Sequence, residues 1–151
     1  MKKISLYIFL VFIWCNLSVN TNAVSNPKIQ SSKGELFLSE KIIEGFYDYV
    51  KQPFSKVPLI FFISEDRRDF YAVIIERIQY NSGQSDGGAY IPIQTSKCQS
   101  KLKQKCYIFS NLRNIVWDNG RNHKKTKKSK INSKISKEDL IIKLGESGLI
   151  E

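Results

Sequence analysis

The chain has 151 residues, with nine Phe, seven Tyr and two Trp, and a formal net charge of +10 at pH 7. This length allows one small packed domain. Without Cys15, which lies in the apolar N-terminal segment, two cysteines and one histidine remain, fewer than the four ligands of a structural zinc site. The positive charge favours anionic partners and does not bear on the fold.

The chain begins with a leader typical of exported proteins. Met-Lys-Lys precedes an apolar run from Ile4 to Cys15, and a polar stretch with a small residue at Ala23 follows. Twelve helical residues span about 18 Å, well short of the roughly 30 Å hydrocarbon core of a bilayer. We therefore predict a signal peptide over residues 1–23 and a periplasmic or secreted mature protein. A retained membrane anchor and a lipid anchor on Cys15 are the alternatives.

Changes in composition divide the remainder of the chain. We expect an N-terminal linker over residues 24–35, a domain over 36–118, a basic disordered linker over 119–136 and a short C-terminal helix over 137–151. The charge is concentrated in the third of these segments, since no acid occurs between residues 121 and 137.

The first half of the domain reads as a helix and a hairpin. Apolar residues from Leu38 to Val50 recur every three or four positions, with Ser39 as a helix cap and Pro53 as a stop. Two β-rich runs, residues 59–63 and 70–75, are joined by a charged reversal, and a loop rich in turn formers follows over residues 81–88.

The second half repeats this order. We predict a helix over residues 93–102 and a second hairpin from the runs 106–109 and 114–117. The expected fold class is α+β, with a small antiparallel sheet of two hairpins and helices on one face.

Removing the leader leaves two cysteines, Cys98 and Cys106. An even number in an exported chain predicts a disulfide, which at this spacing would stabilise the domain by about 2–3 kcal/mol. A redox or metal site is the alternative, but the spacing differs from Cys-x-x-Cys and His123 is the only histidine.

These residues resemble a known group of proteins. Phe61 to Asp66, the cysteine pair with Tyr107-Ile-Phe109, and Ile115-Val-Trp117 resemble small uncharacterised exported proteins of alphaproteobacteria. The resemblance implies a periplasmic or envelope location and a structural disulfide, and it brings no catalytic residues. The chain departs from the group in lacking the further cysteines that some relatives carry and in having a long basic extension.

The C-terminal segment has a helix signature of its own. Ser136-Lys-Glu-Asp139 has the form of a capping box, and Gly145 can end the helix that it opens. Residues 140–151 are similar to the short SHOCT-type helices of bacterial proteins, which would imply oligomerisation or docking. The alternative is a terminal helix that folds back on the domain or frays.

The acid-free basic stretch is the candidate binding site. It can release counterions from a polyanion such as an anionic membrane surface or an envelope glycan, and a protein partner for the domain is also expected. It has no aromatic side chain for base stacking and no recognition motif, so sequence-specific nucleic acid is not expected. The polyanion-binding candidates are Arg121, Lys124, Lys125, Lys127, Lys128, Lys130 and Lys134.

Catalytic motifs are absent from the sequence: it has no nucleophile elbow and no phosphate-binding loop, and no cofactor is expected. Glu65, Asp66 and Asp69 could form an acid pair of the kind used on glycans, but a solvated turn explains them more simply. Our preferred hypothesis is a non-enzymatic, exported interaction module. A small envelope hydrolase acting on cell-wall glycan is the alternative.

Overall fold

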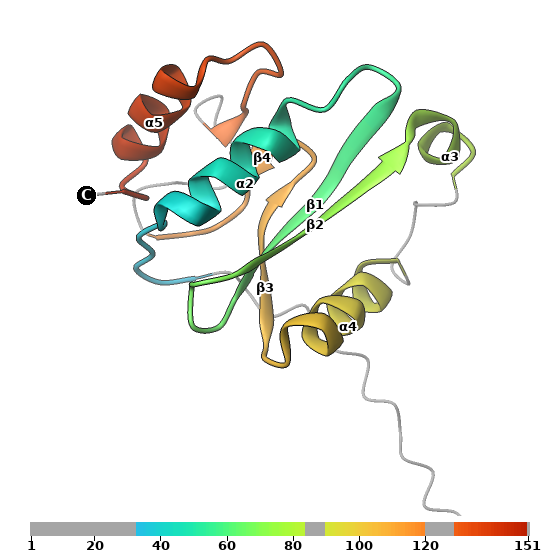
Figure 1. Ribbon diagram of the computed structural model, residues 1–151, viewed down its shortest axis with the longest axis horizontal. Coiled ribbons are helices and arrows are strands. Elements are labelled where there is room, and N and C mark those ends of the chain that lie inside the picture. The colour runs from blue at the N-terminus through green and yellow to red at the C-terminus, as the bar shows by residue number, and fades with distance from the viewer. Residues whose placement is uncertain (1–32, 84–89, 120–128, 151) are drawn as a thin grey trace, which may run out of the picture.

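A four-stranded antiparallel sheet lies at the centre of the computed structural model, which describes residues 33–83, 90–119 and 129–150 (Figure 1). The elements in chain order are α2 (Glu40–Val50), β1 (Lys56–Ser64), β2 (Phe70–Glu76), α3 (Arg77–Asn81), α4 (Tyr90–Leu102), β3 (Cys106–Asn111), β4 (Asn114–Ile115) and α5 (Lys137–Glu146). The strand order is β2-β1-β3-β4. The α+β class and the two hairpins are therefore confirmed.

The two hairpins meet through their first strands. Ile63 of β1 lies opposite Phe70 of β2 on one side and opposite Tyr107 of β3 on the other. β1 is therefore a central strand, and all of its residues after Lys56 are buried.

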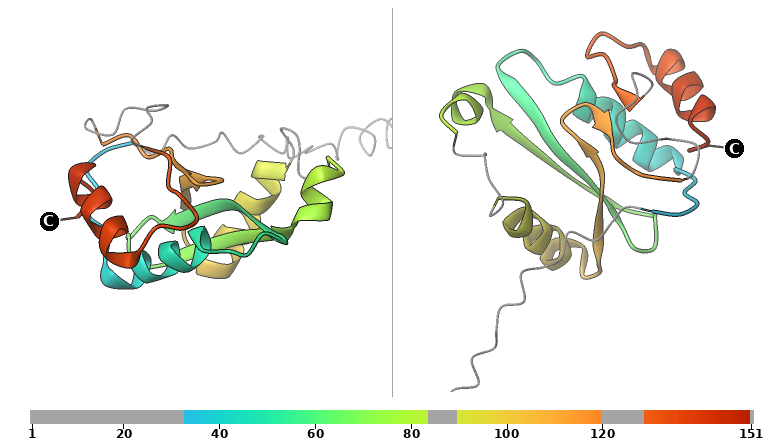
Figure 2. Two further views of the ribbon diagram at one scale, coloured as in Figure 1. Left: turned by 90° about the horizontal axis from the view of Figure 1, so that it is seen from above. Right: turned by 180° about the vertical axis from the view of Figure 1, so that it is seen from behind.

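The two faces of β1 belong to different clusters of buried side chains. Phe61 and Ile63 pack with α2, whereas Ile60 and Phe62 pack with α4. Successive residues of a strand point to opposite faces, so α2 and α4 cover opposite faces of the sheet. The expectation that the helices lie on one face of the sheet is therefore wrong. Figure 1 shows α2 in front of the sheet, and the right-hand view of Figure 2 shows it behind.

Aromatic rings fill the space between α2 and the sheet. The ring of Phe46 makes edge contacts with those of Phe61 and Phe109, at centroid distances of 5.2 and 5.0 Å. Gly45 allows α2 to approach this closely, because a Cβ atom there would lie 2.1 Å from the ring of Phe70. The glycine costs helix propensity, and the close packing of Phe70 explains its place in α2.

The C-terminal segment is part of the same core. Leu140, Leu144 and Leu149 are fully buried beside the α2 residues, and the Leu38 N–H donates to the Leu149 carbonyl at 2.8 Å. Ser136 caps α5 as predicted, since its hydroxyl accepts from the Asp139 N–H at 3.0 Å. The helix thus folds back on the domain.

The expected linkers need correction where they are described. Residues 129–136 are not a disordered linker: Lys130 pairs with Asn114, and the Ile131 N–H donates to the Arg113 carbonyl at 2.8 Å. Before α2, the backbone of Lys33 forms an isolated parallel β-bridge with that of Asp118. These segments therefore belong to the domain.

Several boundaries also differ from the sequence prediction. α4 begins at Tyr90 rather than residue 93, β4 ends at Ile115, and the short helix α3 was not predicted. The predicted signal peptide lies outside the described residues. Within the described part of the chain, no helix has the length and apolar character needed to cross a membrane.

Candidate functional site

The turn between β1 and β2 holds the three carboxylates of the hydrolase alternative. The Asp66 carboxylate accepts hydrogen bonds from the Ser64 hydroxyl at 2.6 Å and from the Arg68 N–H at 3.1 Å. The Asp66 N–H donates to the side-chain oxygen of Gln104, also at 3.1 Å. Asp66 therefore closes the reversal and ties it to the segment before β3.

The other two carboxylates of this turn form ion pairs. Glu65 pairs with Lys105 at 3.3 Å, and Asp69 pairs with Lys41. The Ser64 hydroxyl and then the Arg68 N–H hold the pKa of Asp66 below its ordinary value. A general acid on a glycan needs a raised pKa, so this arrangement is suited to stabilising a turn.

The cysteines are joined as predicted. The Cys98 Sγ of α4 and the Cys106 Sγ at the start of β3 form a disulfide with an S–S distance of 1.96 Å. Both residues are buried, with Phe62 and Val73 in the same cluster. The disulfide therefore fixes α4 to the face of the sheet opposite α2. Its burial is typical of a structural disulfide.

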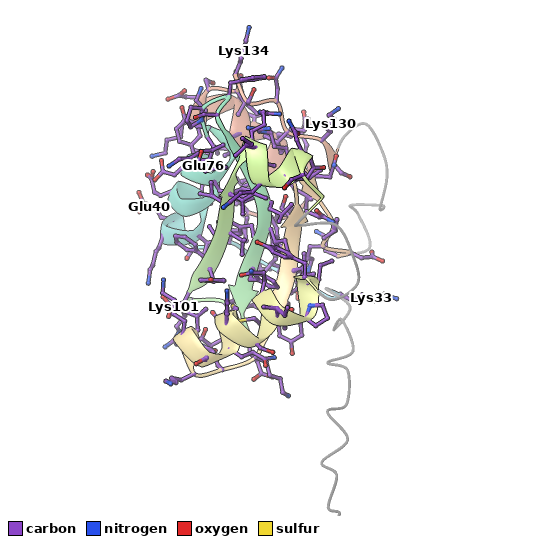
Figure 3. The ribbon with its side chains drawn as sticks, turned by 90° about the vertical axis from the view of Figure 1, so that its right-hand side faces the viewer. Lys33, Glu40, Glu76, Lys101, Lys130 and Lys134 are labelled. Carbon is purple, nitrogen blue, oxygen red and sulfur yellow. A yellow bond between two sulfur atoms is a disulfide. The ribbon has the colours of Figure 1, made fainter. Side chains whose placement is uncertain are left out.

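The basic candidates are only partly described. Lys130 and Lys134 are exposed, and the Lys130 carbonyl accepts a hydrogen bond from Lys143 Nζ at 2.8 Å. Figure 3 shows Lys33 and Lys130 on one side of the molecule and Glu40 on the other. Five candidates lie outside the described residues: Arg121, Lys124, Lys125, Lys127 and Lys128.

The basic residues of segment 121–128 are flanked on both sides by residues that are fixed to the domain. Before it, the Asn119 side-chain nitrogen donates to the carbonyls of Ser147 and Gly148 at 2.9 and 3.0 Å. After it, Ser129 and Ile131 are buried. The sequence did not indicate these anchors, and residues 119–136 were expected to form a disordered linker before a short C-terminal helix. The signal that could have indicated one of them is an isolated apolar residue, Ile131, among polar and basic neighbours.

The arrangement defines a small disulfide-bonded α+β domain whose own C-terminal helix completes the core. Among the described residues, no cluster of three or more His, Cys, Asp or Glu side chains is placed to hold a metal ion. No protein-family model, no curated protein and no solved structure matches the chain. The resemblance to exported alphaproteobacterial proteins therefore stays a prediction.

Proposed function

We propose that the protein is a non-enzymatic interaction module of the periplasm or envelope, and that its basic stretch contacts an anionic surface. The observation that supports this most is that the basic segment 121–128 is flanked by Asn119 and Ile131, both of which are fixed to the domain. Lys130 and Lys134 are exposed beside the second anchor. The proposal gives these cations a common partner.

The physics of such contacts favours an anionic lipid or glycan surface. Each basic residue close to an anionic membrane contributes about 1 kcal/mol, and the attraction weakens with salt. A segment with fixed ends has fewer conformations to lose on binding than a free tail of the same length. The disulfide supports an exported location, because thiols in the cytosol are kept reduced.

The test is binding to heparin and to vesicles that contain phosphatidylglycerol, measured over a series of salt concentrations. Changing Lys124, Lys125, Lys127 and Lys128 together to Gln should weaken binding by at least about tenfold at low salt and flatten the salt dependence. A matched variant removes the same charge from exposed lysines outside both proposed contact surfaces: Lys97, Lys101, Lys103 and Lys105.

Equal losses in these two variants would mean that only net charge matters, and unchanged binding in the first would refute the proposal. Export has its own readout. The native product should begin near Val24 when its mass is measured in the organism that makes it. A native chain that retains Met1 would contradict the cleaved signal peptide.

No observation favours the glycan hydrolase over this proposal. Its three candidate carboxylates hold the β1–β2 turn through Ser64, Lys105 and Lys41. A hydrolase would need one carboxyl group with a raised pKa beside a second that stays ionised, whereas hydrogen bonds lower the pKa of Asp66.

A further inference from the structure

The most exposed large apolar side chains among the described residues are Phe54, 83% exposed, and Ile78, 77% exposed. Phe54 lies in the loop before β1, and Ile78 lies in α3 directly after β2. Lys56 of β1 lies opposite Glu76 of β2 in the strand register, so the two segments meet at the same end of the sheet (Figure 1). Single exposed apolar residues are common, but two of this size at one end call for an explanation.

Arg77 holds this end in shape. Its guanidinium lies 4.1 Å from the centroid of the Phe54 ring, and its Nε donates to the Phe54 carbonyl. The Arg77 N–H also donates to the Ser55 carbonyl at 2.7 Å. The loop is therefore fixed to α3 while the Phe54 ring stays in solvent, covered on one face by a cation.

Further cations lie at the same end of the molecule. The loop over residues 51–56 contains two exposed lysines and no acid, while Glu76 supplies a negative charge nearby. Lys51 Nζ donates to the Ile135 carbonyl at 3.3 Å, which brings the segment with Lys134 to the same end. Figure 3 shows Lys134 at the extreme end of the molecule, with Glu76 below it.

We infer that this end docks on an anionic lipid bilayer, with Phe54 and Ile78 entering the headgroup boundary. The Phe54 end consists of these two residues with Lys51, Lys56, Arg77 and Lys134. This inference rests on the proposed function and names its surface as lipid. Charge complementarity selects that occupant: projecting apolar side chains with a rim of long cationic ones suit the boundary between acyl chains and anionic headgroups.

The test separates insertion of apolar side chains from charge attraction. Residues 24–151 are the expected mature product and retain every contact described above, without the apolar leader that would itself bind lipid. Changing Phe54 and Ile78 together to Ser should weaken binding to phosphatidylglycerol vesicles by about tenfold or more, because both side chains lose their burial in the membrane. Binding to heparin, which has no apolar interior, should not change.

The matched control changes one Phe and one Ile away from this end, Phe37 and Ile93, which are 43% and 51% exposed. It should bind vesicles as the unchanged protein does, with circular dichroism confirming that both variants fold. Equal vesicle binding by the F54S/I78S variant and the unchanged protein would overturn the inference and leave the proposed function standing. If the unchanged protein bound neither the vesicles nor heparin, both the inference and the proposed function would be overturned.

Discussion

Arg113 Nε donates a 2.9 Å hydrogen bond to the carbonyl oxygen of Val50, the last residue of α2. A second guanidinium nitrogen reaches the Gln52 carbonyl at 3.4 Å. The carbonyls at a helix C-terminus have no partner within the helix and carry partial negative charge. Arg113, in the turn between β3 and β4, therefore closes α2 and fixes the start of the loop that presents Phe54.

Changing Arg113 to Ala should lower the free energy of unfolding by about 1–3 kcal/mol, because the carbonyls of Val50 and Gln52 lose a charged donor. Urea denaturation measures the change. Lys at this position keeps the charge but cannot reproduce the planar guanidinium, so R113K should recover only part of the loss. An R113A variant as stable as the unchanged protein would show that water replaces the guanidinium without cost.

Tyr49 makes a second link between α2 and the sheet. Its hydroxyl lies 2.5 Å from the Leu112 carbonyl oxygen and 3.0 Å from that of Pro58, in a buried site. The Y49F variant should lose about 1–2 kcal/mol of stability at neutral pH, since these carbonyls lose a donor. Urea denaturation of both proteins at neutral pH measures the loss.

The same residue predicts a pH dependence. Burial raises the pKa of Tyr49 above its ordinary value near 10. Its contribution is therefore fully present below about pH 10 and falls as the pH rises further, because the unfolded chain then loses the proton first. The stability difference between the unchanged protein and Y49F should shrink above pH 10. A difference that stays constant to pH 11 would contradict this assignment.

Sequence patterns predicted the elements that local chemistry specifies. Ser136 bonded to the Asp139 N–H is such a case, as is the reversal that Asp66 closes. The placing of helices on both faces was missed, although its signal was present. A continuous apolar run such as residues 59–63 is typical of a strand buried on both faces, which requires a cover on each.

The candidate surfaces were predicted less completely than the fold. The cations can be identified from the sequence. The burial of Ile131 cannot, because no periodic pattern of apolar residues surrounds it and its position depends on backbone bonds of residues 130 and 131 to the start of β4 and to Arg113. The exposed Phe54 could not be predicted either. Its setting arises from the register that places Lys56 opposite Glu76 and so brings Arg77 to the ring.

A substitution at Ile131 tests whether the segment 129–136 is part of the core. The side chain is 1% exposed, so I131A should cost about 2–4 kcal/mol in urea denaturation. The control I142A removes the same atoms from a residue of α5 that is 61% exposed, and it should change stability by no more than about 0.5 kcal/mol. Equal effects of the two substitutions would contradict the packing of this segment.

The disulfide should be the strongest single constraint on α4. Removing it by changing Cys98 and Cys106 to Ala should lower the free energy of unfolding by about 2–3 kcal/mol, because the unfolded chain regains the conformations that the closed ring excludes. A reducing agent should destabilise the unchanged protein by a similar amount and leave the double variant as it was. Insensitivity of the unchanged protein to complete reduction, verified by thiol titration of the unfolded chain, would show that packing of α4 against Phe62 and Val73 suffices without the covalent link.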